Sequence, residues 1–139
     1  MTMQHAFTTT LAAALCLAGA AAQAEDCKTG FTATNPDAIY TVHGDGTVTD
    51  NRTGLMWKQC LEGQDAANNC ANSGTNMTWK NALTHAEGHT FAGYSDWRLP
   101  NSKELESLVE HCRENPAINK QIFLNALPSY VWSGSPYAG

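Results

Sequence analysis

The stretch that most constrains the fold is residues 93–112, GYSDWRLPNSKELESLVEHC, because strand, turn and helix signals follow one another there. Tyr94, Trp97 and Leu99 are bulky side chains of the kind that strands favour. Pro100 cannot donate a backbone hydrogen bond, and it disfavours helical backbone at the residue before it. The sequence therefore predicts a strand that ends in a turn at Pro100.

A helix is predicted to begin directly after this turn. Asn101 stands three residues before Glu104, the spacing of a capping box, in which each side chain accepts a hydrogen bond from the other residue's backbone N–H. Apolar positions then recur at i, i+3, i+4 and i+7, which places them on one helical face. They are Leu105, Leu108, Val109 and Cys112. That face must be buried against the rest of the domain.

The first 24 residues have the features of a secretory signal peptide. Residues 6–22 are apolar and rich in alanine, and Ala22, Gln23 and Ala24 form an A-x-A cleavage site. The apolar run is shorter than the ~20 residues that a membrane-spanning helix needs. The sequence therefore predicts a secreted or periplasmic protein with no membrane span.

Export favours disulfides among the four cysteines that follow the leader, and three pairings of these are possible. Cys60 and Cys70 flank a loop of mostly small and polar residues with no other means of holding its shape, so we expect them to pair. This leaves Cys27 for Cys112. A zinc site is the alternative, but the sequence has no C-x-x-C spacing to support it.

The charge balance argues against nucleic acid as a partner. The formal net charge is −5, and the few basic residues are scattered. After the leader, the chain is long enough for one domain with a modest core. We expect residues 25–37, punctuated by Gly30 and Pro36, to form a tether, and residues 38–139 to form the domain.

A three-stranded meander is predicted at the start of this domain. Residues 39–42, 47–49 and 55–57 have strand composition, and the segments 44–46 and 50–54 have turn composition. Asp45, Asp50 and Asn51 are oxygen donors that could bind calcium. Turn geometry is the stronger explanation for the two aspartates, and no EF-hand register is present. We therefore predict no cofactor, with calcium as the alternative.

Residues 78–87 are predicted to form the other helix, with Thr78 as its N-cap and Gly88 at its end. Its apolar face consists of Trp79, Ala82, Leu83 and Ala86. His85 and His89 are four residues apart, a spacing that can bring two metal ligands together. Gly88 intervenes and no H-E-x-x-H pattern is present, so we expect solvated surface histidines rather than a metal pair. A last short strand is predicted at residues 130–132.

Several segments together resemble the Lcl C-terminal domain family of exported bacterial proteins. They are GDGTVTDNRTGLMWKQC (44–60), TWKNAL (78–83), GYSDWRLPNSKELESLVE (93–110), NPAIN (115–119) and WSGSPYAG (132–139). The resemblance implies an α+β, C-type-lectin-like fold, with two helices packed on small twisted antiparallel sheets. Family members usually continue with further strands, so the resemblance also implies that this domain is truncated at its C-terminus.

The resemblance and the composition together favour a non-catalytic recognition domain that binds an extracellular glycan or protein. Asp96 and Arg98 are the candidate binding residues. Their structural interpretation is stronger, because in a strand they would share a face and satisfy each other or nearby backbone while Trp97 points into the core. No catalytic or metal-binding residue is predicted. The alternatives are a lectin-fold enzyme that uses cysteine or metal chemistry, and a non-functional fragment of a longer protein.

Overall fold

The computed structural model describes residues 27–136, and the predicted signal peptide lies outside this range. An antiparallel sheet is formed by β1 (Tyr40–Val42), β2 (Thr47–Asp50) and β3 (Leu55–Lys58), in the order β1-β2-β3. This is the predicted meander. Val48, at the centre, pairs with Val42 on one side and Trp57 on the other.

The two aspartates of the meander form its turns. Asp45 Oδ1 accepts hydrogen bonds from the backbone N–H and the hydroxyl of Thr47, at 2.9 and 2.6 Å. Asp50 Oδ1 accepts one from the backbone N–H of Arg52 at 2.9 Å. Both are the local bonds by which aspartate stabilises a turn. The turn interpretation of these side chains therefore accounts for their geometry.

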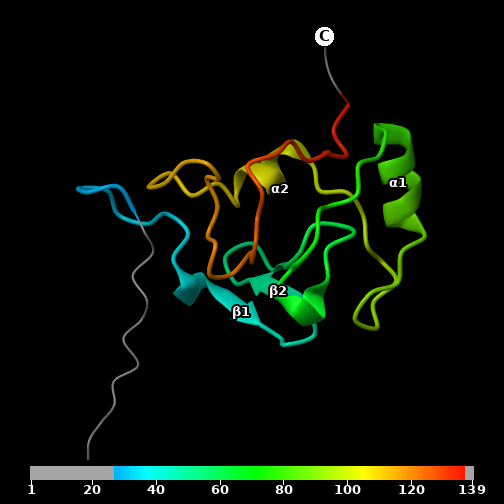
Figure 1. The fold of residues 1–139 in the computed structure, drawn as a ribbon, viewed down its shortest axis with the longest axis horizontal. Helices are drawn as coiled ribbons and strands as arrows, with labels where there is room; N and C mark the ends of the chain where they lie inside the picture. Colours follow the sequence, from blue (N-terminus) through cyan, green and yellow to red (C-terminus); the bar gives the residue numbers. More distant parts are fainter. Residues whose placement is uncertain (1–26, 137–139) are drawn as a thin grey trace, which may run out of the picture.

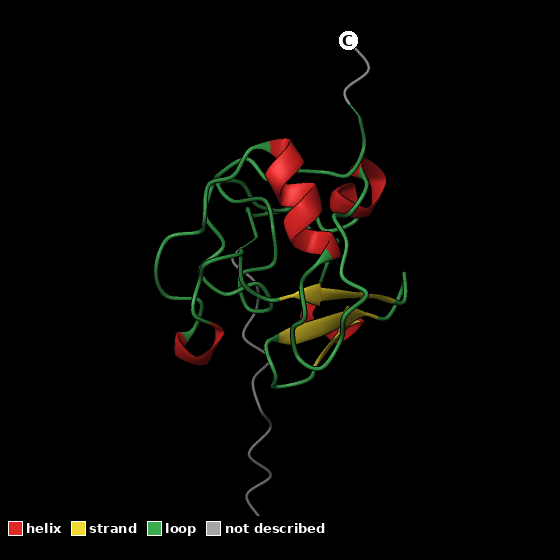
Figure 2. Ribbon diagram, turned by 90° about the vertical axis from the view of Figure 1, so that its right-hand side faces the viewer, coloured by secondary structure: helices red, strands yellow, loops and turns green. Residues whose placement is uncertain are grey.

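Two helices lie at the other end of the molecule from the sheet (Figures 1 and 2). Helix α1 is Trp79–Glu87, capped by Thr78 as predicted, and helix α2 is Ser102–Glu106, with the predicted capping box. Two short 3₁₀ helices, η1 (Asp37–Ile39) and η2 (Ala66–Asn68), complete the regular structure. No helix in residues 27–136 is both long enough and apolar enough to cross a bilayer.

Helix α2 is shorter than the sequence predicts. After it, Val109 forms an isolated bridge with Ile118, and the backbone N–H of Glu110 donates to the carbonyl of Ala117 at 3.0 Å. These tertiary bonds take backbone groups that a longer helix would have used. Leu108 and Cys112 are nevertheless buried, at 7% and 1% exposure, as their apolar pattern requires.

The predicted strand that includes Tyr94, Trp97 and Leu99 is not formed. Its only ladder contact is an isolated bridge between Phe91 and Tyr94, and residues 95–100 have no regular structure. The indole N–H of Trp97 donates to the carbonyl of Phe91 at 3.1 Å, which folds the segment back on itself. The predicted strand at residues 130–132 is also absent.

The last described segment, residues 130–136, instead joins the two helices. The indole N–H of Trp79 donates to the Ser133 carbonyl, and that of Trp132 to the Met77 carbonyl, both at 2.8 Å. The backbone N–H of Gly134 donates to the Pro100 carbonyl at 2.7 Å. In Figure 1 this red segment runs from α2 toward the side of α1.

The core lies between the sheet and the later loops. A cluster of buried side chains forms its centre: Tyr40, Val48, Leu108, Ile122 and Phe123. The rings of Tyr40 and Phe123 meet edge to face, with centroids 5.7 Å apart. Trp57 packs against this cluster from β3, so one face of the sheet is covered by side chains from the second half of the chain.

Disulfides link Cys27 to Cys112 and Cys60 to Cys70, the two pairs that the sequence analysis favours. The first ties the N-terminal segment to the region after α2. The same segment is held there by the buried Glu110 carboxylate, which accepts backbone hydrogen bonds from Thr34 at 2.9 Å and Asn35 at 2.7 Å. The segment predicted as a tether is therefore packed on the domain.

Candidate functional site

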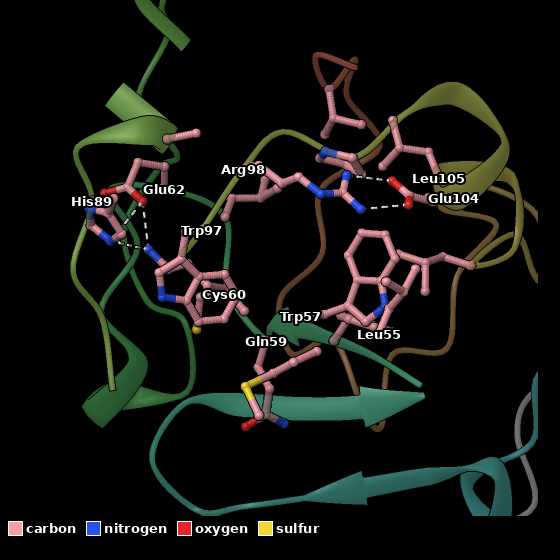
Figure 3. A pocket seen from close by; sticks show the side chains of 18 of the residues that line it. Leu55, Trp57, Gln59, Cys60, Glu62, His89, Trp97, Arg98, Glu104 and Leu105 are labelled. Atoms are coloured by element: carbon pink, nitrogen blue, oxygen red, sulfur yellow. Dashed lines mark hydrogen bonds and ion pairs between the residues drawn. The ribbon is translucent and has the colours of Figure 1, made fainter. Parts of the chain in front are cut away.

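A pocket of about 620 Å³ opens between β3, the loop that follows it, the end of α1 and the start of α2 (Figure 3). The strand supplies Trp57 and Lys58, and the loop after it supplies Glu62. The irregular segment 94–100 supplies Trp97 and Arg98. The loss of the predicted strand at this segment thus leaves its side chains free to line a cavity.

Aromatic side chains form much of the pocket wall. Figure 3 shows the rings of Trp57 and Trp97 on opposite sides of the open space. Trp97 is half-buried and meets the rings of Tyr94 and Phe91 edge to face, with centroids 6.4 and 6.1 Å away. Trp132, from the C-terminal segment, also lines the pocket and is 51% exposed. These rings present large apolar faces to anything that enters.

A bidentate ion pair crosses the pocket above these rings. Arg98 donates to both oxygens of Glu104, at 2.8 and 2.7 Å, and the Glu104 side chain also accepts the capping bond from the Asn101 N–H at 2.8 Å (Figure 3). The Arg98 guanidinium and this backbone bond lower the pKa of Glu104 to about 2. Both charges are therefore present at neutral pH, and the two planar groups are fixed in orientation.

The structure changes the interpretation of the two predicted binding residues. Asp96 and Arg98 both line the pocket and both are exposed, but Arg98 binds Glu104 rather than Asp96. The predicted mutual pairing depended on a strand that does not form. The alternative, a bond to nearby backbone, is present from Arg98 Nη1 to the Leu99 carbonyl at 3.2 Å. Trp97 forms part of the pocket wall and does not belong to the buried core cluster, so its predicted core position is wrong.

A cluster of ionisable side chains lies at another part of the wall. Glu62 approaches Lys58 Nζ at 2.5 Å, His85 Nε2 at 3.4 Å and His89 Nε2 at 3.9 Å. Burial raises the pKa of Glu62, but the hydrogen bond and the positive charge of Lys58 outweigh it, so the pKa is lowered overall. The His85 side chain is 43% exposed and the His89 side chain 21%, so only His85 fits the predicted solvated histidine well.

Two groups of side chains in residues 27–136 have the composition and proximity to hold a metal ion. One is Glu62, His85 and His89. The other combines Glu110 with Cys27 and Cys112, whose sulfurs are joined in a disulfide. A disulfide sulfur is not a thiolate, so this second group lacks the ligands that a metal requires.

The sequence analysis assigned no site role to several residues of this pocket. Trp57 was predicted only as part of a strand, Glu104 only as a capping residue, and Glu62 had no assigned role. The approach of Glu62 to residues 85 and 89 depends on the loop path after β3. The i, i+4 spacing of the histidines was the single local signal for this cluster.

The chain matches the family model described as the Lcl C-terminal domain over residues 46–139. This range includes the pocket residues named above. No curated protein and no solved structure gives a significant match.

Proposed function

The chain belongs to the Lcl C-terminal domain family, and we propose that it is an exported, non-catalytic recognition domain that binds carbohydrate in the pocket between Trp57 and Trp97. The observation that carries this proposal is the combination of two indole rings on opposite sides of the pocket with a bidentate ion pair. We also propose that the fold is a variant of the C-type-lectin-like fold. Its support is the antiparallel sheet with two helices and the long-range disulfide.

The pocket chemistry suits the two kinds of surface on a sugar. A pyranose ring has an apolar face of C–H groups, which can pack on an aromatic ring, and a rim of hydroxyl groups, which need hydrogen-bond partners. Trp57 and Trp97 offer the ring faces. Arg98 offers donors and Glu104 offers acceptors at the same opening. Because the ion pair is already formed, these groups need little ordering when a ligand binds.

The cysteine chemistry of the alternative enzyme hypothesis has no support in the described part of the chain. All four cysteines of residues 27–136 are in disulfides. A nucleophilic cysteine must be a free thiolate. This favours a binding role for the pocket.

A glycan array that carries neutral and acidic oligosaccharides tests the proposal, with calorimetry on each oligosaccharide that binds. We expect Trp97→Ala to weaken binding at least tenfold, which corresponds to the ~1.4 kcal/mol that one stacked ring can supply. Arg98→Ala should also weaken binding. Phe31→Ala is the control, because Phe31 is 63% exposed and lies outside the pocket.

Thermal melting of each variant separates loss of binding from loss of folding. The proposal is wrong if the wild-type protein binds no oligosaccharide on the array. It is equally wrong if Trp97→Ala and Arg98→Ala, both folded, bind as tightly as Phe31→Ala.

A further inference from the structure

We propose that Glu62, His85 and His89 form a binding site for a divalent transition-metal ion, of which Zn²⁺ is the representative. One nitrogen from each histidine and one carboxylate oxygen all lie within 4.8 Å of one another. The three side chains line the pocket described above. This inference does not depend on the proposed binding of carbohydrate.

The distances are close to those of a zinc site before the metal enters. Zinc binds nitrogen and oxygen ligands at about 2.0–2.2 Å in a tetrahedron, so neighbouring ligand atoms are about 3.3 Å apart. His85 Nε2 lies 3.4 Å from Glu62 Oε1, and His89 Nε2 lies 3.9 Å from Glu62 Oε2. These two contacts use different oxygens of Glu62, so side-chain rotation must bring one oxygen and the two nitrogens from within 4.8 Å of one another to the tetrahedral spacing.

The position of Lys58 shows that the cluster attracts a cation. Its ammonium group contacts Glu62 Oε2 at 2.5 Å and His89 Nε2 at 3.3 Å. An ammonium group has donors and no acceptor, so His89 Nε2 must present its lone pair to the cluster. A metal requires this unprotonated nitrogen. The ammonium group therefore contacts the same two ligand atoms, Glu62 Oε2 and His89 Nε2, that a metal ion would use.

A metal ion would take the place of this ammonium group. Lys58 has a second favourable contact, because its Nζ lies 4.5 Å from the centre of the Phe91 ring. A cation–π contact of this kind can retain the displaced ammonium group nearby. Exchange of one cation for another keeps the Glu62 carboxylate neutralised.

The ligand set determines the class of metal. Two imidazole nitrogens and one carboxylate suit Zn²⁺ and its neighbours Ni²⁺ and Cu²⁺, whereas Ca²⁺ and Mg²⁺ prefer oxygen ligands alone. Three protein ligands also leave the fourth tetrahedral position open. Because the three side chains line the pocket, water or a ligand atom could reach the ion from there and complete the coordination.

Calorimetric titration of the untagged mature protein with ZnCl₂ tests the site. We expect one equivalent of Zn²⁺ to bind and Ca²⁺ to give no signal. Glu62→Gln, His85→Ala and His89→Ala should each weaken Zn²⁺ binding at least tenfold. His43→Ala and His111→Ala are matched controls, because both histidines are exposed and neither belongs to the cluster. Each control should leave Zn²⁺ affinity unchanged.

Two further measurements do not rely on a loss of binding in a variant. Co²⁺ bound to the wild-type protein should give the visible absorption of a four-coordinate ion, and Zn²⁺ should abolish it. Lys58→Met should raise Zn²⁺ affinity severalfold, because the competing ammonium group is gone. The proposal is overturned if the wild-type protein binds no Zn²⁺, if binding survives in the folded double variant His85→Ala/His89→Ala, or if Lys58→Met weakens it.

Discussion

Glu110 is a fully buried carboxylate that connects two segments far apart in the sequence. It accepts hydrogen bonds from the backbone N–H groups of Thr34, Asn35 and Cys112, at 2.9, 2.7 and 2.9 Å. Burial by itself raises the pKa of Glu110, but these bonds outweigh it and lower the pKa to about 2. These backbone N–H groups, together with the Thr34 hydroxyl at 2.9 Å, stabilise the charge in the way that a helix terminus holds an anion.

Replacement of Glu110 by glutamine should destabilise the domain by about 2–3 kcal/mol at pH 7, because a charged acceptor is lost from several buried hydrogen bonds. Glu106→Gln is the control, since Glu106 is exposed in the neighbouring helix. Urea denaturation of both variants measures the difference. A midpoint for Glu110→Gln equal to that of Glu106→Gln would show that the bonds contribute nothing.

The same carboxylate makes stability depend on pH in a defined direction. Its folded-state pKa, about 2, is below the ordinary value of 4.5, so its contribution is complete above about pH 4.5 and is lost as pH falls toward 2. The stability difference between the wild-type protein and Glu110→Gln should therefore shrink across this window. Denaturation curves at pH 6, 4 and 2.5 measure it. A constant difference would contradict the assignment.

At the scale of elements, helix α2 depends on its cap more than on its length. It has five residues, Ser102–Glu106, too few to be stable as an isolated helix. The Asn101 side chain accepts a hydrogen bond from the Glu104 backbone N–H at 2.9 Å, and the Glu104 side chain accepts one from the Asn101 backbone N–H. The cap also orients Glu104 toward Arg98, so one local motif positions a pocket residue.

Asn101→Ala should cost about 1 kcal/mol of stability, the ordinary contribution of an N-cap. Asn101→Ser keeps an acceptor at the same place and is the matched control. Guanidinium denaturation compares the two. Equal losses in both variants would mean that the asparagine acts through some contact other than the cap.

The segment 130–136 is held by the indole N–H groups of two tryptophans, by the backbone bond of Gly134, and by the Ser135 hydroxyl, which accepts from the Ser102 N–H at 3.0 Å. Trp132→Phe keeps an aromatic ring but removes the donor to the Met77 carbonyl. In the wild-type protein the Gly134 amide donates to the Pro100 carbonyl. We expect this amide to exchange its hydrogen faster in Trp132→Phe. Tyr130→Phe is the control, because the Tyr130 side chain is fully exposed. Unchanged exchange in Trp132→Phe would contradict this anchoring role.

At the scale of the molecule, local signals predicted the local structure and failed where distant segments meet. The meander and both N-caps were predictable because the turn at Asp45 and the box at Asn101 and Glu104 are made by neighbours in sequence. The ion pair of Arg98 with Glu104 was missed because it depends on an irregular backbone path. The contact between Asn35 and Glu110 spans 75 residues and has no sequence pattern.

In the pocket, too, local features were predictable and contacts between distant segments were not. The spacing of His85 and His89 is visible in the sequence, but their approach to Glu62 follows from the loop that Cys60 and Cys70 close. The aromatic character of the pocket could be expected from composition. The location of the pocket could not be predicted, because Trp57 lies in β3 and Trp97 in an irregular segment that does not pair with it.

The two disulfides should differ in what they stabilise, because they close loops of very different length. The Cys27–Cys112 bond spans 85 residues and the Cys60–Cys70 bond spans 10. The chain-entropy model assigns about 4–5 kcal/mol to the long closure and about 3 kcal/mol to the short one. The long bond also holds the segment that contacts Glu110, so its loss weakens those hydrogen bonds as well.

We therefore expect the double variant Cys27→Ser/Cys112→Ser to have a lower melting temperature than Cys60→Ser/Cys70→Ser, when both are purified from an oxidising compartment. The short bond should matter more for the pocket, since it fixes the loop that carries Glu62. Calorimetric melting and the environment of the pocket tryptophans, followed by fluorescence, measure the two effects separately. Equal melting temperatures would show that loop closure is not the main contribution, and that native contacts around each bond decide its effect.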